Sequence, residues 1–390
     1  MARRGKSIDY DVTNVLSKID LHIVSFNVPL PANYGGVIDV FYKLDALTKM
    51  GCKVALHCFD YGRGEVKELK KHAAEVFYYT RKVSAWNAIV LSPFSVKSRS
   101  SEQLLKRLSA DEAPILFESL QCCLYLDHPE LAHKRKWVRA HNVEHNYYNS
   151  LAQYESSGLR KSYYALEANA LRKYEKVLHH ADGVLAISPK DQAYFEKLGH
   201  VSKYLPAFYR KEVQDNFAKE EKSIALYQGN LKVEENVEAV LFLLEVFQDS
   251  PYSLIVAGSQ PGKDIQERVA KMSNVTLLAN PSDQEMFDLI RTSKVNCLPS
   301  FQSTGIKLKL LHALTSGNQV LVNPTMVEGT GLEKYCSVAD EIEDWRRQLE
   351  LLFSAETEMQ KIQTRQELVS GLFDNQKNAT QLAEWLELAL

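Results

Sequence analysis

The chain alternates short apolar runs with longer stretches in which apolar residues recur every three or four positions. Continuous apolar runs of this length are typical of strands buried on both faces, and the longer stretches have the period of helices. The predicted strands of the first half are 21–26, 53–59, 75–79, 114–118, 137–140 and 183–188. Those of the second half are 224–228, 252–258, 275–279, 296–300 and 319–323. Strands that alternate with helices predict parallel, doubly wound α/β sheets.

A polar segment of mixed charge at 209–222 interrupts this alternation, which restarts after it. A chain of 390 residues is also long enough for two ordinary domains. We therefore expect two Rossmann-like domains, an N-terminal domain over 19–208 and a C-terminal domain over 223–372, facing each other across a cleft. The remaining segment, 373–390, has a helical pattern.

Charge and cysteine usage narrow the class of protein. The 47 basic and 49 acidic residues nearly cancel, so no global field attracts nucleic acid. The six cysteines lie mostly in apolar runs without metal-site spacing, as reduced core residues of a cytoplasmic protein do. We recognise neither a signal peptide nor an apolar run of about 18 residues that would span a membrane. Peripheral contact with the inner face of a membrane stays open.

Two glycine-containing turns precede predicted helices and suggest anion sites. Gly35 and Gly36 lead into an apolar-faced helix, and Gly305 precedes a helix predicted over 306–316. A helix amino terminus offers unpaired N–H groups and a partial positive charge, and glycine lets an anion approach closely. We expect these sites to bind phosphate, with Lys307 beside the second of them. The structural alternative is a tight turn that needs glycine. The first turn lacks the GxGxxG pattern, so a dinucleotide-dependent dehydrogenase is not favoured.

The segment from His141 to His145 reads His-x-x-Glu-His, a string found in zinc peptidases. That chemistry needs both histidines on one helix face. Here His141 directly follows a predicted strand and the helical pattern begins near Asn146, so we expect no zinc. An Asp-x-Asp pair at Asp9 and Asp11 precedes the first strand and is not interpreted as a metal site. We expect neither a metal nor a cofactor.

Two motifs resemble those of the family-4-like glycosyltransferases (glycosyl transferases group 1), and the likeness extends along most of the chain. One is Ser303-Thr304-Gly305-Ile306-Lys307-Leu308-Lys309, between a strand and a helix, and the other is Arg139-Ala140-His141-Asn142-Val143-Glu144. The resemblance implies the two-domain GT-B fold, with the last helix crossing back to the first domain. It also implies a retaining, metal-independent hexosyltransferase of polysaccharide biosynthesis that uses a nucleotide-diphosphate sugar. The acceptor would be a carbohydrate or lipid-linked.

The same resemblance assigns roles to individual positions. His141 would face the reacting sugar as the catalytic residue, with a core or capping histidine as the alternative. The first domain would bind the acceptor and the second the nucleotide sugar. The donor-binding positions would be Gly35, Gly36, Gly229, Asn230, Ser303, Thr304, Gly305, Ile306, Lys307 and His312.

The chain departs from the family at four of its usual charged positions. Thr304 and His312 stand where the family has glutamates, and Asn230 and Glu235 stand where it often has phosphate-binding cations. Lys307 or Lys309 could supply the missing positive charge. Two alternatives to a transferase therefore stay open: a non-catalytic glycosyltransferase-like subunit and a sugar-nucleotide epimerase.

Overall fold

The first half of the chain forms a parallel sheet within the N-terminal domain of a computed structural model. The structure describes residues 18–83, 92–155, 157–210, 221–302 and 307–389. Within them the sheet has seven strands in the order β3 (Glu75–Thr80), β2 (Val54–Asp60), β1 (Leu21–Ser25), β4 (Ile115–Glu118), β5 (Lys136–Ala140), β6 (Gly183–Ala186) and β7 (Ser202–Tyr204). The order reverses at β1, which places a crevice at the carboxyl ends of β1 and β4.

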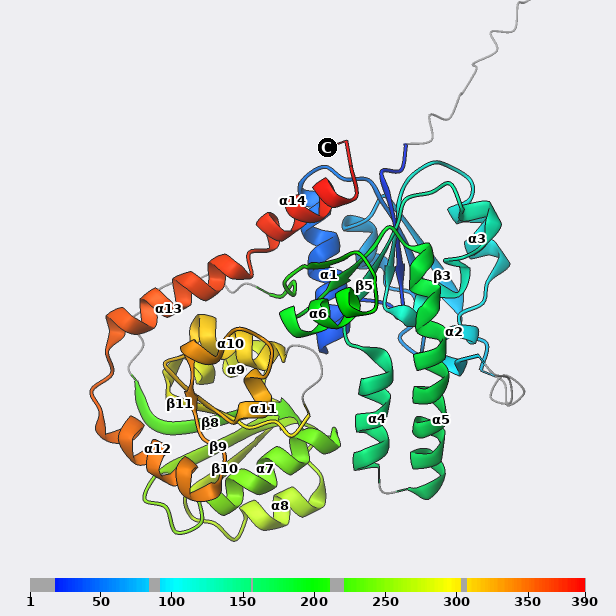
Figure 1. The fold of residues 1–390 in the computed structure, drawn as a ribbon. Helices are drawn as coiled ribbons and strands as arrows, with labels where there is room; N and C mark the ends of the chain where they lie inside the picture. Colours follow the sequence, from blue (N-terminus) through cyan, green and yellow to red (C-terminus); the bar gives the residue numbers. More distant parts are fainter. Residues whose placement is uncertain (1–17, 84–91, 156, 211–220, 303–306, 390) are drawn as a thin grey trace, which may run out of the picture.

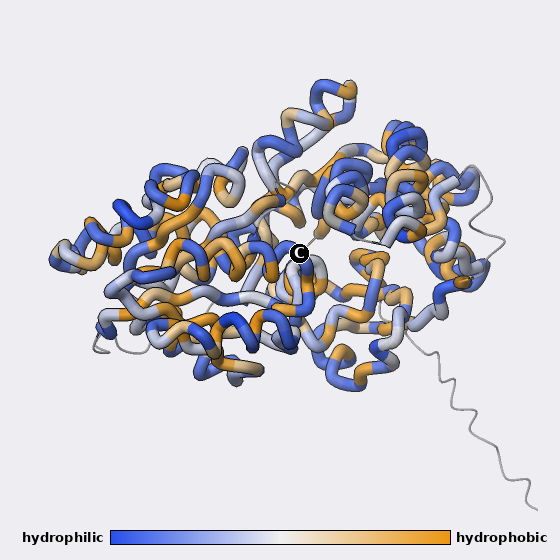
Figure 2. Tube along the Cα trace, turned by 90° about the horizontal axis from the view of Figure 1, so that it is seen from below, coloured by the Kyte–Doolittle hydropathy of each residue, from blue (hydrophilic) through white to orange (hydrophobic). Residues whose placement is uncertain are grey.

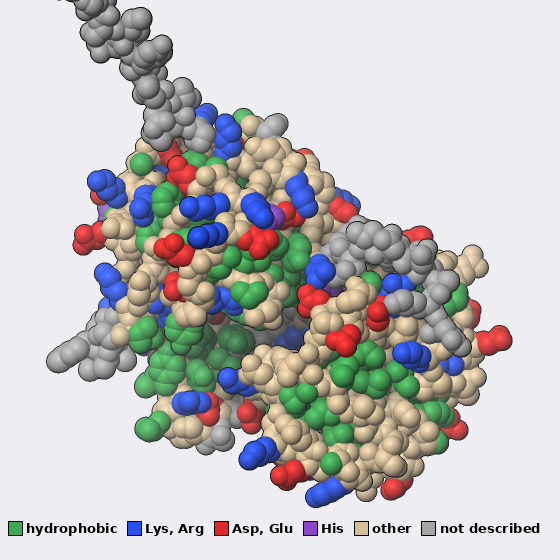
Figure 3. Space-filling model, turned by 180° about the vertical axis from the view of Figure 1, so that it is seen from behind, with side chains coloured by type: hydrophobic (Ala, Val, Ile, Leu, Met, Phe, Trp, Pro, Cys, Tyr) green, Lys and Arg blue, Asp and Glu red, His purple; other side chains and the backbone are tan. Residues whose placement is uncertain are grey.

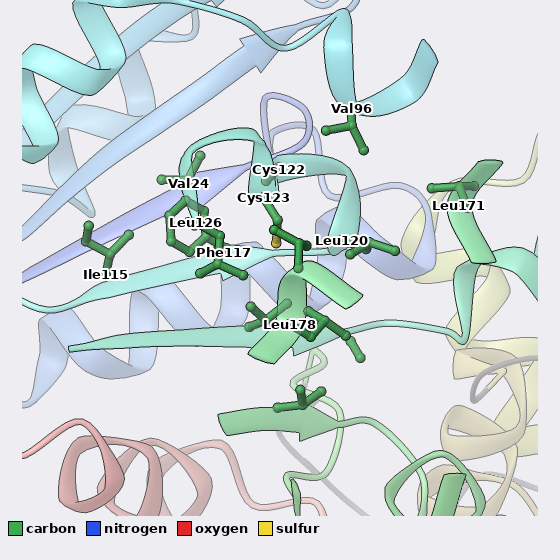
Figure 4. Close-up of a cluster of buried hydrophobic side chains, with 14 of the residues drawn as sticks. Val24, Val96, Ile115, Phe117, Leu120, Cys122, Cys123, Leu126, Leu171 and Leu178 are labelled. Carbon is green, nitrogen blue, oxygen red and sulfur yellow. The ribbon is translucent and has the colours of Figure 1, made fainter. Parts of the chain in front are cut away.

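Both faces of this sheet are covered because apolar side chains point to both sides of each strand. Its α-helices are α1 (Gly35–Lys49), α2 (Phe94–Lys97), α3 (Glu102–Leu108), α4 (Glu144–Tyr154), α5 (Gly158–Tyr174) and α6 (Pro189–Lys197). Short 3-10 helices are η1 (Lys67–Lys71), η3 (Leu120–Tyr125), η4 (Pro129–Leu131) and η5 (Glu175–His180). Ile115 and Phe117 pack in one cluster with residues of η3 and η5 (Figure 4). Leu116 packs in another cluster, which contains residues of α1. This alternation follows from the two-residue period of a strand.

The second half forms the other sheet, again parallel. Its strand order is β10 (Val275–Ala279), β9 (Ser253–Ser259), β8 (Lys222–Asn230), β11 (Ser293–Leu298), β12 (Gln319–Val322) and β13 (Ser337–Val338). The helices are α7 (Glu234–Val246), α8 (Lys263–Val269), α9 (Asp283–Thr292), α10 (Leu308–Ser316), α11 (Pro324–Val327), α12 (Ile342–Ser354) and the 3-10 helix η6 (Glu333–Tyr335). Hydrophobic segments gather inside each of the two lobes (Figure 2).

The chain then returns to the first domain. Helix α13 (Met359–Leu372) packs on α10, and α14 (Asn375–Trp385) packs on α1, where Leu382 joins the apolar core (Figure 1). Among the described residues, Tyr209 on the outgoing segment is tied to Asn375 on the returning segment. The Tyr209 N–H donates to Asn375 Oδ1 (3.2 Å), and Asn375 Nδ2 donates to the Tyr209 carbonyl (2.8 Å).

The predicted α/β class and the two facing Rossmann-like domains are confirmed, and the predicted strands are all present. Two details differ. Helix α10 begins at Leu308 rather than at residue 306, with Lys307 as its N-cap. Helix α4 begins at Glu144, two residues before the predicted start, because the Glu144 carboxylate suits a first helical turn. His141 still precedes the helix.

Candidate functional site

A cavity of about 450 Å³ lies between the two domains and is lined by residues of both. The first domain contributes Gly35 and Gly36 at the start of α1 and His141 after β5, and the second contributes Glu235 and Lys307. The space-filling view shows a hollow where the two lobes meet, with hydrophobic side chains gathered on one side of it (Figure 3). Ligands of doubly wound sheets bind at this place, outside the carboxyl ends of the strands.

Beneath the cavity, charged side chains from three elements form a buried cluster around Asp39 and Glu118. Lys43 Nζ lies 2.8 Å from Asp39 Oδ2 and 2.7 Å from Glu118 Oε1. Arg139 donates to both oxygens of Asp39, from Nε at 3.1 Å and from Nη2 at 2.8 Å. His141 Nε2 lies 2.9 Å from Glu118 Oε2. Two cations, Lys43 and Arg139, thus neutralise two carboxylates, and this pairing offsets the energetic cost of burying all four groups.

This environment keeps both carboxylates ionised. Burial alone would raise the pKa of Asp39, but Arg139 and Lys43 outweigh it and hold the pKa far below its usual range. Burial would likewise raise the pKa of Glu118, and Lys43 together with the hydrogen bond from His141 lowers it instead. An ionised Glu118 can only accept hydrogen bonds, so His141 Nε2 carries a proton that it donates to Glu118.

The hydrogen bond to Glu118 therefore fixes the position of the His141 ring. Its Nδ1 is buried, lies 3.8 Å from Asp39 Oδ2 and has no hydrogen-bond partner among the described residues. The ring packs edge-on against Phe26 with centroids 5.4 Å apart, and the residue lines the cavity. Because Nε2 donates to Glu118, an imidazole held in this orientation has Nδ1 left to accept a hydrogen bond without first reorganising.

Asp39, Glu118 and His141 bring ligand atoms within 4.8 Å of one another, as a metal site would require. Their donor set does not suit a metal, because the Lys43 ammonium already occupies the space between the two carboxylates and would repel a divalent cation. His145 does not join this group: its Nδ1 faces Glu175 Oε1 at 3.4 Å. The two histidines of the His-x-x-Glu-His string thus have different partners.

A second polar group lies on the same wall of the cavity. Ser119 directly follows β4 and has a φ of 75°, a conformation that costs a non-glycine residue about 1–3 kcal/mol. Its hydroxyl donates to Glu144 Oε1 (2.6 Å), and Gln121 Nε2 donates to Glu144 Oε2 (3.2 Å). Ser119 and Gln121 thus hold the Glu144 carboxylate at the cavity wall, with one hydrogen bond to each of its oxygens.

The opposite wall is formed by the second domain. Glu235, in the first turn of α7, accepts a hydrogen bond from Ser300 Oγ (2.8 Å), and Lys307 Nζ lies 3.3 Å from its Oε1. Lys309 points elsewhere and donates to Asn236 Oδ1 (2.9 Å) and Tyr227 Oη (3.2 Å). Burial lowers the pKa of Lys309 to about 8. Of the two lysines, Lys307 is the one that lines the cavity.

The two glycines at the start of α1 have different surroundings. A Cβ on Gly36 would lie 2.7 Å from Phe26 Cζ, so packing requires glycine there. A Cβ on Gly35 would meet nothing within 4 Å, so this glycine faces open space. Tyr34, the N-cap of α1, makes no side-chain cap hydrogen bond, which leaves the helix terminus suited to an anion.

The other predicted donor-binding residues lie apart from the cavity or outside the described residues. Gly229 and Asn230 end β8 and do not line it. His312 does not line it either, and its ring packs against Tyr209 with centroids 5.8 Å apart. Ser303, Thr304, Gly305 and Ile306 lie outside the described residues.

Our sequence prediction did not include Asp39, Lys43 and Glu118 among the site residues. A signal for them exists. Asp39 and Lys43 are charged residues four positions apart on a helix whose neighbouring positions are apolar, and Glu118 ends an apolar strand run. Charged residues in a pattern that predicts burial indicate an ion-paired cluster or a functional site.

The fold is the two-domain GT-B architecture of glycosyltransferases. HepE of Anabaena, solved in complex with UDP and glucose, matches with a TM-score of 0.64 at 13% identity, over 95% of this chain and all of that chain. A glycosyltransferase from Rickettsia africae matches with a TM-score of 0.61 at 12% identity, over 95% of this chain and 98% of that chain. Identities this low establish the fold alone.

By sequence, the chain is similar to a protein of Klebsiella pneumoniae described as an uncharacterized 44.6 kDa protein in the cps region. The two are 28% identical over 334 residues, which cover 79% of this chain and 84% of that protein. No family model matches the chain. Among the described helices, none is both long and apolar enough to cross a membrane.

Proposed function

We propose that this protein is a glycosyltransferase that moves a hexosyl group from a nucleotide-diphosphate sugar to a carbohydrate or lipid-linked acceptor. The observation that carries the proposal is the cavity between the two sheets, which brings the start of α1, His141 and Lys307 to one space. The fold shared with HepE, whose structure contains UDP and glucose, supports it.

In the reaction, the bond between the anomeric carbon and the diphosphate breaks, and the diphosphate leaves with the electron pair. The acceptor oxygen bonds to the anomeric carbon, and its proton passes to the departing diphosphate. Negative charge develops on the diphosphate and positive charge on the sugar ring. Fixed positive charge near the diphosphate stabilises its negative charge. The open N-terminus of α1 and Lys307 would act on the diphosphate, and His141 would contact the reacting sugar.

Retention of configuration and independence from metal ions belong to the same proposal, as does the absence of a cofactor. Retention rests on the resemblance of the two motifs. Independence from metal ions is supported by Lys43, which stands between the two carboxylates where a cation would otherwise sit. A cytoplasmic place in polysaccharide synthesis, with or without contact to the inner face of the membrane, is proposed from the relative in the cps region.

Thermal unfolding in the presence of UDP, GDP, ADP and CMP tests the nucleotide site. A nucleotide at 100 times its dissociation constant should stabilise the native state by about 2.7 kcal/mol. We expect one of the four to raise the melting temperature selectively. If none does, a nucleotide-dependent transferase is contradicted.

Substitution of His141 tests the catalytic assignment. His141→Ala should reduce turnover by about 10²- to 10⁴-fold, the usual contribution of a positioned acid or base, with the nucleotide-induced thermal shift retained. Turnover equal to that of the wild type, in a variant that binds the nucleotide normally, would show that His141 has a structural role.

A second candidate is a non-catalytic glycosyltransferase-like subunit. The observation that favours it is the ion pair of Glu235 with Lys307, which places a carboxylate on the cavity wall where a diphosphate would need positive charge. Glu235→Gln discriminates between the two candidates. A transferase should bind its nucleotide more tightly after this change, whereas a subunit without a nucleotide site should show no thermal shift before or after it.

A further inference from the structure

A second cavity, of about 470 Å³, lies in the first domain between the α5–η5 segment and α6. It shares no lining residue with the cleft cavity. None of the residues that line it was assigned a role by the sequence motifs, and the function proposed above does not use them.

Positive charge dominates the rim of this second cavity. Arg172 and Lys176, on the α5–η5 segment, and Lys197, at the end of α6, all line it and are exposed. Within the described part of the chain, none of the three forms an ion pair. Glu175 is the one carboxylate among the lining residues, so three cations face a single anion. Unpaired positive charges around a cavity attract an anion.

The floor of the cavity consists of imidazoles and one tyrosine. His145 and His200 are buried, and the ring of His179 lies against that of His200 with centroids 4.3 Å apart. Glu175 Oε2 already accepts a hydrogen bond from Tyr194 Oη at 2.6 Å.

His145 is buried, and its Nδ1 atom lies 3.4 Å from Glu175 Oε1. This imidazole therefore faces the one carboxylate of the cavity and leaves the three cations of the rim to an occupant.

A transition-metal ion fits this cavity poorly. Among the described residues, three ligand atoms approach within 4.8 Å at Asp39, Glu118 and His141, and the imidazoles of the second cavity do not form such a group. The three cations on the rim would also repel a metal ion.

We propose that the second cavity binds a small phosphomonoester, with its phosphate between Arg172, Lys176 and Lys197. Guanidinium and ammonium groups form charge-assisted hydrogen bonds with phosphate oxygens. A volume of about 470 Å³ falls in the range of small-molecule pockets, and the Tyr194 ring and Leu198 offer a surface for the remainder of the molecule.

The site also lies next to the cleft. His145 lines the second cavity and its neighbour Glu144 lines the cleft cavity, and both belong to the first turn of α4.

Isothermal titration with inorganic phosphate, glucose 6-phosphate and glucose tests the proposal on the intact chain. We expect phosphate and glucose 6-phosphate to bind at a site that the double variant weakens, and glucose not to bind. The double variant Arg172→Gln/Lys197→Gln should weaken phosphate binding by about tenfold or more, because two charge-assisted hydrogen bonds are lost.

Two control variants locate the binding. Lys173→Gln removes the same charge from the same helix at a residue that does not line the cavity, and should leave phosphate affinity unchanged. Lys307→Gln removes a lysine of the cleft, where the proposed diphosphate site lies, and should not reproduce the loss of phosphate affinity that the double variant shows. Because the experiment measures phosphate affinity and not sugar transfer, a failure of this proposal leaves the proposed transferase activity untouched. A failure of the transferase proposal likewise leaves this one untouched.

Three results would overturn the proposal. One is no binding of phosphate or glucose 6-phosphate at millimolar concentration. Another is binding lost in Lys307→Gln and kept in the double variant, which would place phosphate in the cleft. The third is that the wild-type protein binds no free phosphomonoester but sediments with phosphatidic acid vesicles, and that the double variant no longer sediments with them. This outcome would identify a lipid headgroup as the ligand.

Discussion

At the scale of single residues, the cluster around Glu118 links the stability of the first domain to the position of His141. Glu118 accepts from Lys43 on one oxygen and from His141 on the other, so the same carboxylate neutralises a buried ammonium and fixes an imidazole. A buried ion pair adds little stability relative to apolar packing, but removing one partner leaves the other charge without compensation.

Glu118→Ala should therefore lower the free energy of unfolding by about 3–5 kcal/mol, because Lys43 loses one of its two carboxylate partners in a buried site. Urea denaturation measures the change. Glu112→Ala is the control: this exposed carboxylate pairs with His133 at the surface, and its loss should cost at most about 1 kcal/mol. Equal losses in the two variants would contradict the coupling of Glu118 to Lys43.

His312 should make stability depend on pH. Burial, with a smaller contribution from Arg210, lowers the pKa of His312 from 6.5 to about 4. The unfolded chain binds the proton first as the pH falls, so this contribution to stability is complete above pH 6.5 and is lost progressively toward pH 4.

In His312→Gln, the fall in unfolding free energy between pH 7 and pH 5 should be shallower than in the wild type, by at most about 1.4 kcal/mol per pH unit. Urea denaturation at the two values measures the slopes. His180→Gln, at an exposed histidine, should keep the wild-type slope. A wild-type slope in His312→Gln would show that His312 is not the responsible group.

The sequence indicated some site residues and not others for a physical reason. Gly35 was predicted because it lies in a turn before a helix, which a local pattern reveals, and His141 was predicted from its place in a motif that resembles one of a known family. Lys43 and Glu118 are 75 positions apart, and nothing local shows that helix α1 and strand β4 bring them together. His312 was predicted from its place in a motif, and its burial against Tyr209 depends on a residue 103 positions earlier.

At the scale of elements, most strands were predictable because both faces of each sheet are covered, which makes these strands apolar runs. The short edge strands β7 and β13 have no such run and were not predicted. The start of α10 was less predictable, because its N-cap Lys307 makes no side-chain cap hydrogen bond and therefore gives no capping signal. By contrast, Ser282 and Glu285 form the capping box that opens α9, and a Ser followed three positions later by Glu is a capping signal that can be seen in the sequence.

Helix α14 belongs energetically to the first domain although it follows the second in sequence. Leu382 is fully buried in the core beside α1, so Leu382→Ala should reduce the unfolding free energy of the first domain by about 2–5 kcal/mol. Leu372→Ala, at a residue 49% exposed near the end of α13, should change it by about 0.5 kcal/mol or less. Chemical denaturation followed at Trp137 and Trp385, whose rings stack 6.5 Å apart, measures both. A loss below about 1 kcal/mol in Leu382→Ala would contradict the docking of α14.

At the scale of the whole molecule, the two domains meet through an apolar cluster and a small polar contact. Ile187 and Tyr209 of the first domain pack in one core with Leu311 of the second. Beside it, Lys190 Nζ pairs with Glu328 Oε1 at 2.7 Å, and Gly329 lies directly against the Lys190 side chain. These contacts set the separation of the lobes and so the width of the cavity.

Gly329→Ala should widen that separation, because the added Cβ would lie 2.5 Å from Lys190 Cβ. Gly331→Ala is a matched control: both glycines have positive φ, 68° and 74°, but a Cβ at Gly331 meets nothing within 4 Å. Both variants carry a similar backbone cost of about 1–2 kcal/mol. Small-angle scattering should show a larger radius of gyration for Gly329→Ala alone, and an equal radius in both variants would contradict this role of the contact.

The tie between Tyr209 and Asn375 has a mechanical consequence. Since the chain leaves the first domain at Tyr209 and has returned to it at Asn375, the second domain is an insertion whose two ends are fastened to each other. A tension applied between β1 and α14 would be borne by the first domain and this tie, and the second domain would stay unloaded. Stretched in this way, the molecule should break first at the packing of α14 on α1, and the second domain should stay unloaded for as long as the tie holds.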